Sequence, residues 1–172
     1  DRVDLTNISY IGNGANASVD LKRLGAPFPV EAVGLVGDDE DGRFLVDLCR
    51  QWGIDASQMS VVTGTPTAFT DVMTVKPTGK RTFFYCAGSH DLISPDHFDF
   101  SRTNARILHL GLPGTHATMD APWQGDASGW VTVLKKARAA GLKTNIELCP
   151  IPTERIAELG RPILPHLDYI VI

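Results

Sequence analysis

The sequence of 172 residues contains few cysteines and no long apolar run. Its three cysteines, Cys49, Cys86 and Cys149, are far apart and form no CxxC pair, and their odd number argues against a disulfide framework. We therefore expect a reducing, cytoplasmic environment. No stretch approaches the roughly 18 apolar residues of a membrane-spanning helix, and the first residues lack the pattern of a signal peptide. We expect no membrane partner.

Basic charge is also scarce. Lysine and arginine number 16 against 20 aspartates and glutamates, which gives a net charge of -4. The densest basic group is Lys135, Lys136 and Arg138, and it falls on one expected helix, where a solvated face explains it. Because nucleic-acid-binding proteins usually carry a basic patch, we expect no nucleic-acid partner.

Several catalytic motifs are absent from the sequence. Gly79-Lys80 is followed by Arg81, and Thr74 stands where a Walker A loop needs its first glycine. No G-x-S-x-G elbow occurs, and the five histidines show no spacing typical of metal ligands, so no metal site is expected. Among the histidines, His90 with the adjacent Asp91 merits attention first, because this pair follows an expected hairpin.

Strand-like and helix-like patterns alternate along the chain. The expected strands cover 32–36, 106–110, 144–148 and 168–172, and the expected helices cover 15–24, 44–52, 128–140 and 153–159. Such alternation predicts an α/β fold, a three-layer αβα sandwich with a mostly parallel sheet. The acidic run 38–41 is expected to cap the helix that follows it. The chain ends on an expected strand and shows no clear first strand, so we expect one partial domain over 1–172, incomplete at both ends.

Residues 67–86 interrupt the alternation. Two segments rich in Thr, Val and Phe, 67–75 and 81–86, flank the turn sequence KPTGK and predict a β-hairpin. We expect 64–90 to form a β lid that projects from the main sheet. Because a hairpin edge leaves backbone groups unpaired, it also offers a surface for a homodimer.

The loop GNGAN at 12–16 is the best local signal for a ligand. Gly12 and Gly14 would let a ligand approach the backbone, and Asn13 and Asn16 carry amides that could bind adjacent hydroxyls of a polyol. A tight turn with an asparagine helix cap explains the loop equally well. The segment also satisfies G-x-G-x-x-A, typical of NAD(P)-dependent Rossmann oxidoreductases, but no strongly apolar strand precedes it and Asp38 is only roughly placed.

Longer segments resemble the ribokinase (PfkB) family of carbohydrate kinases. GNGANASVDLKRLG and VGLVGDDEDGRFLVDLCRQWGID are similar to the family's Gly-Gly-x-x-x-Asn and Val-Gly-x-Asp-x-x-Gly region. PTAFTDVMTVKPTGKRTFFYCAG resembles the lid strands, and ARILHLG and LDYIVI resemble later strands. The resemblance implies a sugar substrate, a ribokinase-like fold and ATP-dependent phosphorylation of a sugar hydroxyl, with ATP and Mg²⁺ as cofactors.

The resemblance also implies which residues touch the substrate. The sugar-contacting segment matches Gly12, Asn13, Gly14 and Asn16, the lid matches Phe69, Arg81 and Phe83, and Glu147 lies in a strand that carries a polar site residue. The chain departs from the family at Ile11, at 88–91 and at Gly111, which affects the identity of the sugar.

The resemblance places the family's catalytic machinery after Ile172. The family's Asn-x-x-Glu and Gly-x-Gly-Asp motifs are absent from these 172 residues, as is the substrate-binding aspartate that members carry upstream of the glycine loop. We therefore expect no catalytic residue within the chain, nucleotide and metal sites mostly outside it, and no turnover by these residues alone. A kinase-like sugar-binding module without catalysis is the non-enzymatic alternative.

Overall fold

The computed structural model of the protein describes residues 13–172, and it confirms the alternation of strands and helices. The helices are α1 Asn13–Arg23, α2 Glu40–Gln51, α3 Ala117–Asp120, α4 Gly129–Ala139 and α5 Thr153–Ile163. The strands are β1 Glu31–Gly37, β2 Asp55–Val62, β3 Phe69–Thr74, β4 Arg81–Cys86, β5 Ile107–Leu110, β6 Lys143–Glu147 and β7 Tyr169–Val171. Short 3₁₀ turns lie at Gly88–Leu92, Pro95–His97, Phe100–Arg102 and Leu164–His166.

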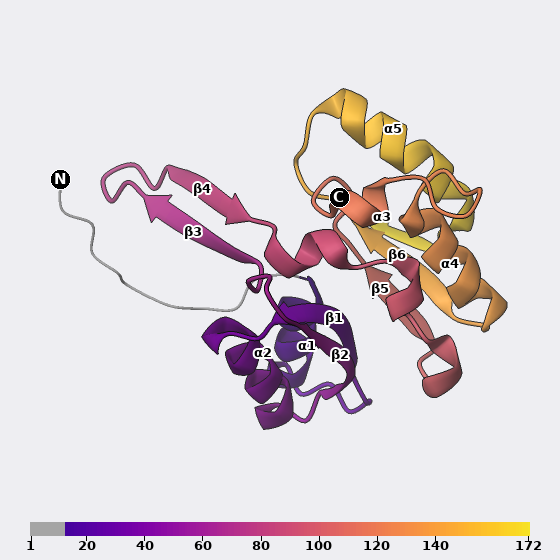
Figure 1. The fold of residues 1–172 in the computed structure, drawn as a ribbon, viewed down its shortest axis with the longest axis horizontal. Coiled ribbons are helices and arrows are strands. Elements are labelled where there is room, and N and C mark those ends of the chain that lie inside the picture. The colour runs from indigo at the N-terminus through magenta and orange to yellow at the C-terminus, as the bar shows by residue number, and fades with distance from the viewer. Residues whose placement is uncertain (1–12) are drawn as a thin grey trace.

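Within residues 13–172 the strands form three sheets. β1 pairs with β2 in parallel, and β6 lies between β5 and β7, again in parallel. β3 and β4 form a separate antiparallel hairpin, which projects away from both parallel sheets in Figure 1. The expected parallel strands are therefore present, but β1 and β5 share no hydrogen bonds. Buried Leu35 of β1 nevertheless joins one apolar cluster with Leu110 and Ile146.

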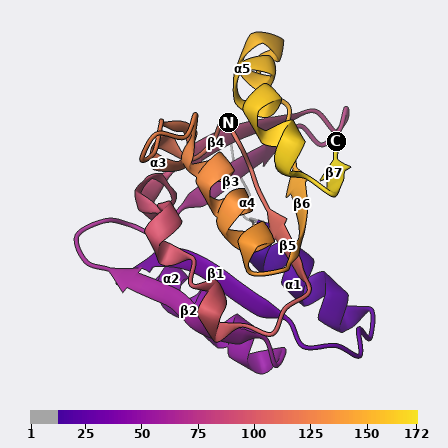
Figure 2. The ribbon, with the colours of Figure 1, turned by 90° about the vertical axis from the view of Figure 1, so that its right-hand side faces the viewer.

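Helices cover both faces of these sheets. On one face of β1 and β2, α1 and α2 bury Val19, Leu48 and Cys49 against the strands. On the other face, Trp130 and Leu134 of α4 pack into the cluster that contains Leu35, and α4 lies alongside β5 and β6 in Figure 2. Residues of β1 alternate between the two clusters because neighbouring side chains of a strand point to opposite faces. The three-layer α/β prediction is confirmed.

Two local expectations need correction. β2 has no counterpart in the sequence prediction, because its exposed and half-buried residues give no clear apolar alternation. α5 extends through Gly160 and Pro162 instead of ending at 159. A glycine costs only about 1 kcal/mol inside a helix, and burial of Leu159 and Ile163 on the inner face of α5 offsets that cost.

The acidic run caps α2 as expected. Asp39 is the N-cap residue, and its Oδ1 accepts a hydrogen bond of 2.8 Å from the Gly42 amide. Among residues 13–172, no helix is both long enough and apolar enough to span a membrane.

Candidate functional site

The carboxyl ends of β5 and β6 meet at one edge of their sheet, where open α/β sheets bind ligands. The loop that follows β5 packs on the segment that follows β6: Cys149 Sγ lies 3.9 Å from the Pro113 carbonyl oxygen. A side chain at Gly114 would collide with Ile151, since an added Cβ would lie 2.4 Å from Ile151 Cδ1. This edge is therefore a closely packed pair of loops, which we call the carboxyl edge (111–116 and 148–151).

Asp120 fixes the first of these loops to the helices behind it. Its Oδ1 accepts hydrogen bonds from the Gly114 amide at 2.9 Å and from Trp130 Nε1 at 2.7 Å. Its Oδ2 lies 3.7 Å from an Arg155 guanidinium nitrogen. The side chain of Asp120 is only 9% exposed, so this carboxylate is a structural junction between the carboxyl edge, α4 and α5.

The hairpin is held at its entry by the acidic motif. Thr67, just before β3, donates from its amide to Asp39 Oδ2 at 2.7 Å and from its hydroxyl to Oδ1 at 2.6 Å. The Thr67 hydroxyl oxygen also accepts a hydrogen bond of 2.8 Å from the Gly37 amide at the end of β1. The Thr67 hydroxyl is the main cause that lowers the pKa of Asp39. The entry strand is thus tied to both β1 and α2.

The hairpin is also held at its exit. The Ser89 amide donates to the Pro66 carbonyl at 2.8 Å, and the fully buried Ser89 hydroxyl donates to the Leu35 carbonyl at 2.9 Å. Gly88 has a φ of +46°, and an added Cβ there would lie 2.3 Å from the Pro66 oxygen. The segment before β3 and the segment after β4 are therefore in contact with each other and with β1, which gives the hairpin a fixed base.

An aromatic cluster joins the hairpin to the carboxyl edge. The Tyr85 hydroxyl of β4 lies 3.1 Å from His90 Nδ1 and 3.3 Å from the Thr115 carbonyl oxygen. The His90 ring stacks on the His116 ring, with centroids 4.9 Å apart and planes 14° apart. The edge of the Trp130 ring meets His116 at 5.3 Å. Three segments far apart in sequence thus share one ring stack.

Burial shifts the acid–base behaviour of this cluster. It lowers the pKa of His90 to about 4, with His116 adding to the effect and Asp91 opposing it. Burial likewise lowers the pKa of His116, against the effects of the Leu112 carbonyl and two aspartates. Burial first, and the Asp91 charge second, raise the pKa of Tyr85 to about 12. At neutral pH the two imidazoles and the phenol of this cluster are therefore uncharged.

A second polar group lies across β5 and β6. The Asn145 amide nitrogen lies 2.8 Å from His109 Nδ1, and His109 Nε2 lies 3.3 Å from Glu147 Oε2. Donation by Asn145 to Nδ1 leaves the ring proton on Nε2, facing the carboxylate. The Nε2–Glu147 contact is within ion-pair range but lacks hydrogen-bond alignment, and Nε2 and Asn145 Oδ1 are buried without a hydrogen-bond partner. The structure thus brings Glu147 together with His109, which the sequence did not single out.

The hairpin register separates the expected lid residues. Pairing of Val72 with Phe83 and of Phe69 with Cys86 puts Arg81, Phe83 and Tyr85 on one face and Phe69 on the other. The Arg81 guanidinium lies 5.5 Å from the Phe83 ring centroid, a cation–π contact on that face. Because Tyr85 reaches Thr115, the face with Arg81 and Phe83 is the one that adjoins the carboxyl edge. Phe69 lies at the base of the hairpin and points the other way.

The glycine-rich loop lies at the start of α1. Gly12 falls outside the described residues, and Asn13 and Gly14 open the helix. Asn16 lies half-buried in the first turn of α1. The expected helix is therefore present. The two interpretations of the GNGAN segment, as a helix start and as a sugar contact, both place its asparagines in the first turn of α1.

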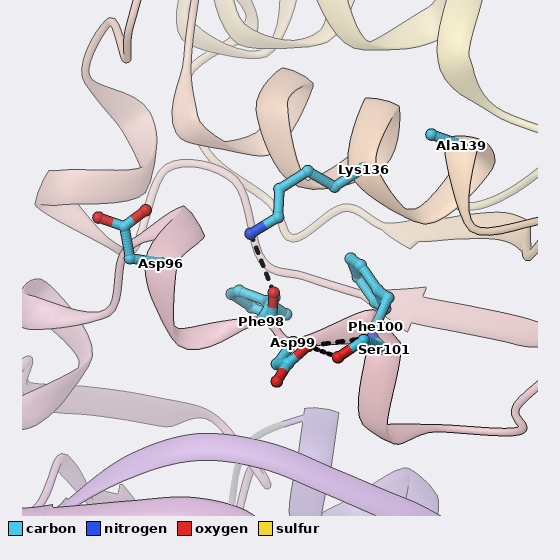
Figure 3. Close-up of a pocket in the computed structure, with 7 residues that line it drawn as sticks. All are labelled: Asp96, Phe98, Asp99, Phe100, Ser101, Lys136 and Ala139. Atoms are coloured by element: carbon cyan, nitrogen blue, oxygen red, sulfur yellow. Dashed lines mark hydrogen bonds between the residues drawn. The ribbon is translucent and has the colours of Figure 1, made fainter.

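An open groove lies elsewhere, at the amino ends of β5 and β6. Asp96, Phe98, Asp99, Phe100, Ser101, Lys136 and Ala139 line a volume of about 520 Å³. Figure 3 shows Lys136 reaching from α4 toward the Phe98 backbone, where its ammonium donates to the carbonyls of Pro95 and Phe98. Since the lysine charge is already bound to these carbonyls and the groove lies opposite the carboxyl edge, we do not assign the substrate to it.

Comparison with known proteins places this geometry in a family. The pattern of the pfkB family carbohydrate kinases matches residues 3–171. The chain belongs to the pfkB family. Fructokinase-2 of Oryza sativa subsp. japonica is 30% identical over 170 residues, 94% of this chain and 48% of that protein. The chain thus spans about half the length of this relative.

Solved structures agree on the fold. Fructokinase from Xylella fastidiosa superposes with a TM-score of 0.70 at 24% identity, covering 92% of this chain and 50% of that one. Ribokinase II from E. coli, solved with ATP and Mg²⁺, gives a TM-score of 0.73 at 18% identity, covering 98% and 54%. The ribokinase-like fold predicted from the sequence is confirmed, and family membership favours the kinase interpretation over the nicotinamide-dependent one.

Sequence reasoning singled out Glu147 and the pair His90-Asp91 but missed Tyr85, His116 and Asp120. The signal for Tyr85 was its alternation with Arg81 and Phe83 on β4. His116 and Asp120 carried no local signal, because their partners lie on the hairpin exit and on α4.

Proposed function

We propose that this protein is an ATP-dependent sugar kinase and that these residues supply the sugar-binding part of its active site. The observation that carries the proposal is the match of the pfkB family pattern over residues 3–171. In this reaction a sugar hydroxyl oxygen bonds to the γ-phosphorus of ATP, the bond from that phosphorus to the bridging oxygen breaks, ADP leaves, and the hydroxyl proton passes to a base.

The sugar site in this proposal lies between the hairpin and the carboxyl edge. The face with Arg81 and Phe83 acts as the lid, Asn16 with Gly12, Asn13 and Gly14 binds hydroxyls at the start of α1, and Glu147 contributes from the end of β6. The side chain of Phe69 is on the opposite face, so in this proposal Phe69 belongs to the base of the hairpin and not to its sugar-facing side. A lid suits phosphoryl transfer because water must be kept from the γ-phosphate.

ATP and Mg²⁺ are proposed as cofactors, with sites mostly outside these residues. Within residues 13–172, no group of three His, Cys, Asp or Glu side chains is placed to hold a metal ion. The support for both cofactors is the solved ribokinase II relative, which holds ATP and Mg²⁺.

The proposal is tested by assaying ADP formation from ATP and Mg²⁺ with two proteins, residues 1–172 alone and the product of the complete coding sequence. Fructose is the first acceptor, because the matched relatives are named fructokinases, followed by ribose and deoxy-keto sugar acids. We expect sugar-dependent turnover only with the complete product. Turnover by residues 1–172 alone would show an unrecognised phosphate site, and sugar binding without any turnover would favour the non-catalytic module.

We further propose a homodimer through the hairpin and a reducing, cytoplasmic location. The hairpin exposes Val72, Met73, Phe83 and Phe84, each at least 39% accessible, and an apolar edge of this kind favours pairing with a second copy. All three cysteines are free thiols. Sedimentation velocity with Phe84→Asp is the test: we expect a shift from dimer to monomer, and an unchanged sedimentation coefficient would refute the hairpin interface.

A further inference from the structure

The hairpin contacts the carboxyl edge through hydrogen bonds of one tyrosine side chain. Tyr85 is the last residue but one of β4, and its hydroxyl reaches both His90 Nδ1 and the Thr115 carbonyl oxygen. The hydroxyl oxygen can accept a hydrogen bond from the N–H at His90 Nδ1 while the hydroxyl donates one to the Thr115 carbonyl. One phenol group therefore bridges the hairpin exit and the loop after β5.

The ring stack behind Tyr85 is held from three sides. His116 Nδ1 lies 2.8 Å from the Thr115 hydroxyl oxygen, and the Trp130 edge meets the outer face of the stack. Asp91 Oδ1 accepts a hydrogen bond of 2.9 Å from the Ala117 amide, and its carbonyl accepts one of 2.5 Å from the Thr118 hydroxyl. His116 and Asp91 are therefore held on the body of the protein, Tyr85 belongs to the hairpin, and the His90 ring lies between Tyr85 and His116.

We propose that Tyr85, His90 and His116 form a latch that positions the hairpin over the carboxyl edge. The hairpin base is fixed at Thr67 and Ser89, so rotation about that base is the motion left to it, and the Tyr85 contacts oppose this rotation. The latch rests on the proposed sugar kinase function for its role in the reaction: Arg81 and Phe83 share the face of Tyr85, so the latch determines where they lie relative to the sugar. These three are positioning residues.

The latch is built from uncharged rings, which makes it sensitive to acid. The charged and titratable groups that face the stack are two aspartates, Asp91 and Asp120, together with Tyr85 and the thiols of Cys86 and Cys149. Burial outweighs the effect of Asp91 at His90 and the effects of both aspartates at His116. Because the pKa of His90 is lowered from 6.5 to about 4 when it is buried, opening of the latch takes up a proton. The stability that the buried His90 adds to closure is fully present above pH 6.5 and declines as the pH falls toward 4.

Hydrogen exchange of the hairpin amides tests the latch without any need for turnover. Tyr85→Phe removes only the hydroxyl, and the loss of one such hydrogen bond predicts exchange over 69–74 and 81–86 that is about 2- to 12-fold faster at pH 7.5. Tyr169→Phe on β7 is the matched control and should leave hairpin exchange unchanged. Equal exchange in Tyr85→Phe and wild type would overturn the latch.

A pH series separates a latch from a purely structural contact. After correction for intrinsic exchange, wild-type hairpin protection should fall by up to about 300-fold between pH 6.5 and 4, the value that follows from the lowered His90 pKa. His90→Asn keeps a polar atom near the Nδ1 position and cannot take up a proton, so it should retain protection at pH 7.5 and lose most of the acid dependence. Wild-type acid dependence in His90→Asn would refute the proposal.

Kinetics then connect the latch to the proposed reaction. In the product of the complete coding sequence, Tyr85→Phe should raise KM for the sugar several-fold and leave KM for ATP unchanged. Altered exchange with an unchanged sugar KM would refute the positioning role. If no variant and no wild-type protein phosphorylates any sugar, the proposed function fails, whereas the exchange results still decide whether the latch exists.

Discussion

Removal of one hydroxyl at the hairpin entry should destabilise the protein more than a surface substitution does. Thr67 is 2% exposed, and its hydroxyl accepts from the Gly37 amide and donates to Asp39 Oδ1. Valine has nearly the same shape, so Thr67→Val removes both hydrogen bonds without creating a cavity. The substitution therefore isolates the polar contribution of this junction.

The expected loss follows from the two partners. The Gly37 amide is left buried and unpaired, which costs about 1–3 kcal/mol, and a hydrogen bond to a charged carboxylate contributes about 1.5–3 kcal/mol. Asp39 keeps its bonds from the Gly42 and Thr67 amides, and the extra methyl group of valine recovers roughly 0.8 kcal/mol. We expect a net loss of roughly 2–5 kcal/mol in the free energy of unfolding.

Urea denaturation followed by circular dichroism measures this loss, with exposed Thr63→Val as the control. The Thr67 hydroxyl is the largest cause that depresses the pKa of Asp39, and a depressed carboxylate pKa contributes stability above its ordinary value of 3.8 that is lost as the pH falls. The difference in the free energy of unfolding between wild type and Thr67→Val should therefore become smaller as the pH is lowered. A loss below about 0.5 kcal/mol at pH 7, the range of surface substitutions, would refute the reasoning.

Three further outcomes are expected. Gly42→Ala should lower the urea midpoint sharply, because its Cβ would lie 2.2 Å from the Gly37 oxygen; a wild-type midpoint would contradict this packing. Lys143 and the Thr144 amide lower the pKa of Asp168 to about 2, so the stability it contributes is present above pH 3.8 and lost as the pH falls through 2. In thermal melts, Asp168→Asn should reduce the fall in melting temperature between pH 3.8 and 2. A fall as large as that of the wild type would exclude the ion pair. Asn16→Ala in the complete protein should raise sugar KM several-fold, and unchanged kinetics would remove Asn16 from the site.

Local patterns predicted most of the elements because their causes lie within a few residues. Asp39 caps α2 through the amide three residues on, and the turn at KPTGK brings β3 and β4 into register. β2 was missed because its side chains are half-buried at the edge of a two-stranded sheet. The end of α5 was placed too early because burial of Leu159 and Ile163 is a tertiary effect that outweighs the glycine at 160.

The candidate site was predicted only in part. The sequence pointed to the hairpin, to Glu147 and to His90-Asp91. It did not pair Glu147 with His109, because these residues are 38 positions apart and meet only when β5 and β6 align in parallel. It grouped Phe69 with Arg81 and Phe83, whereas the pairing register separates the two faces.

By itself the sequence determined the family, the order of strands and helices, and the acidic cap, since each depends on residues close together in the chain. Only the tertiary structure decided that Thr67 binds Asp39 across 28 residues and that Tyr85 reaches Thr115 across 30. Hydrogen bonds act over about 3 Å, so they form only after the packing of the sheets and helices has brought distant segments together. These contacts, at the entry of the hairpin and at Tyr85, are therefore properties of the fold.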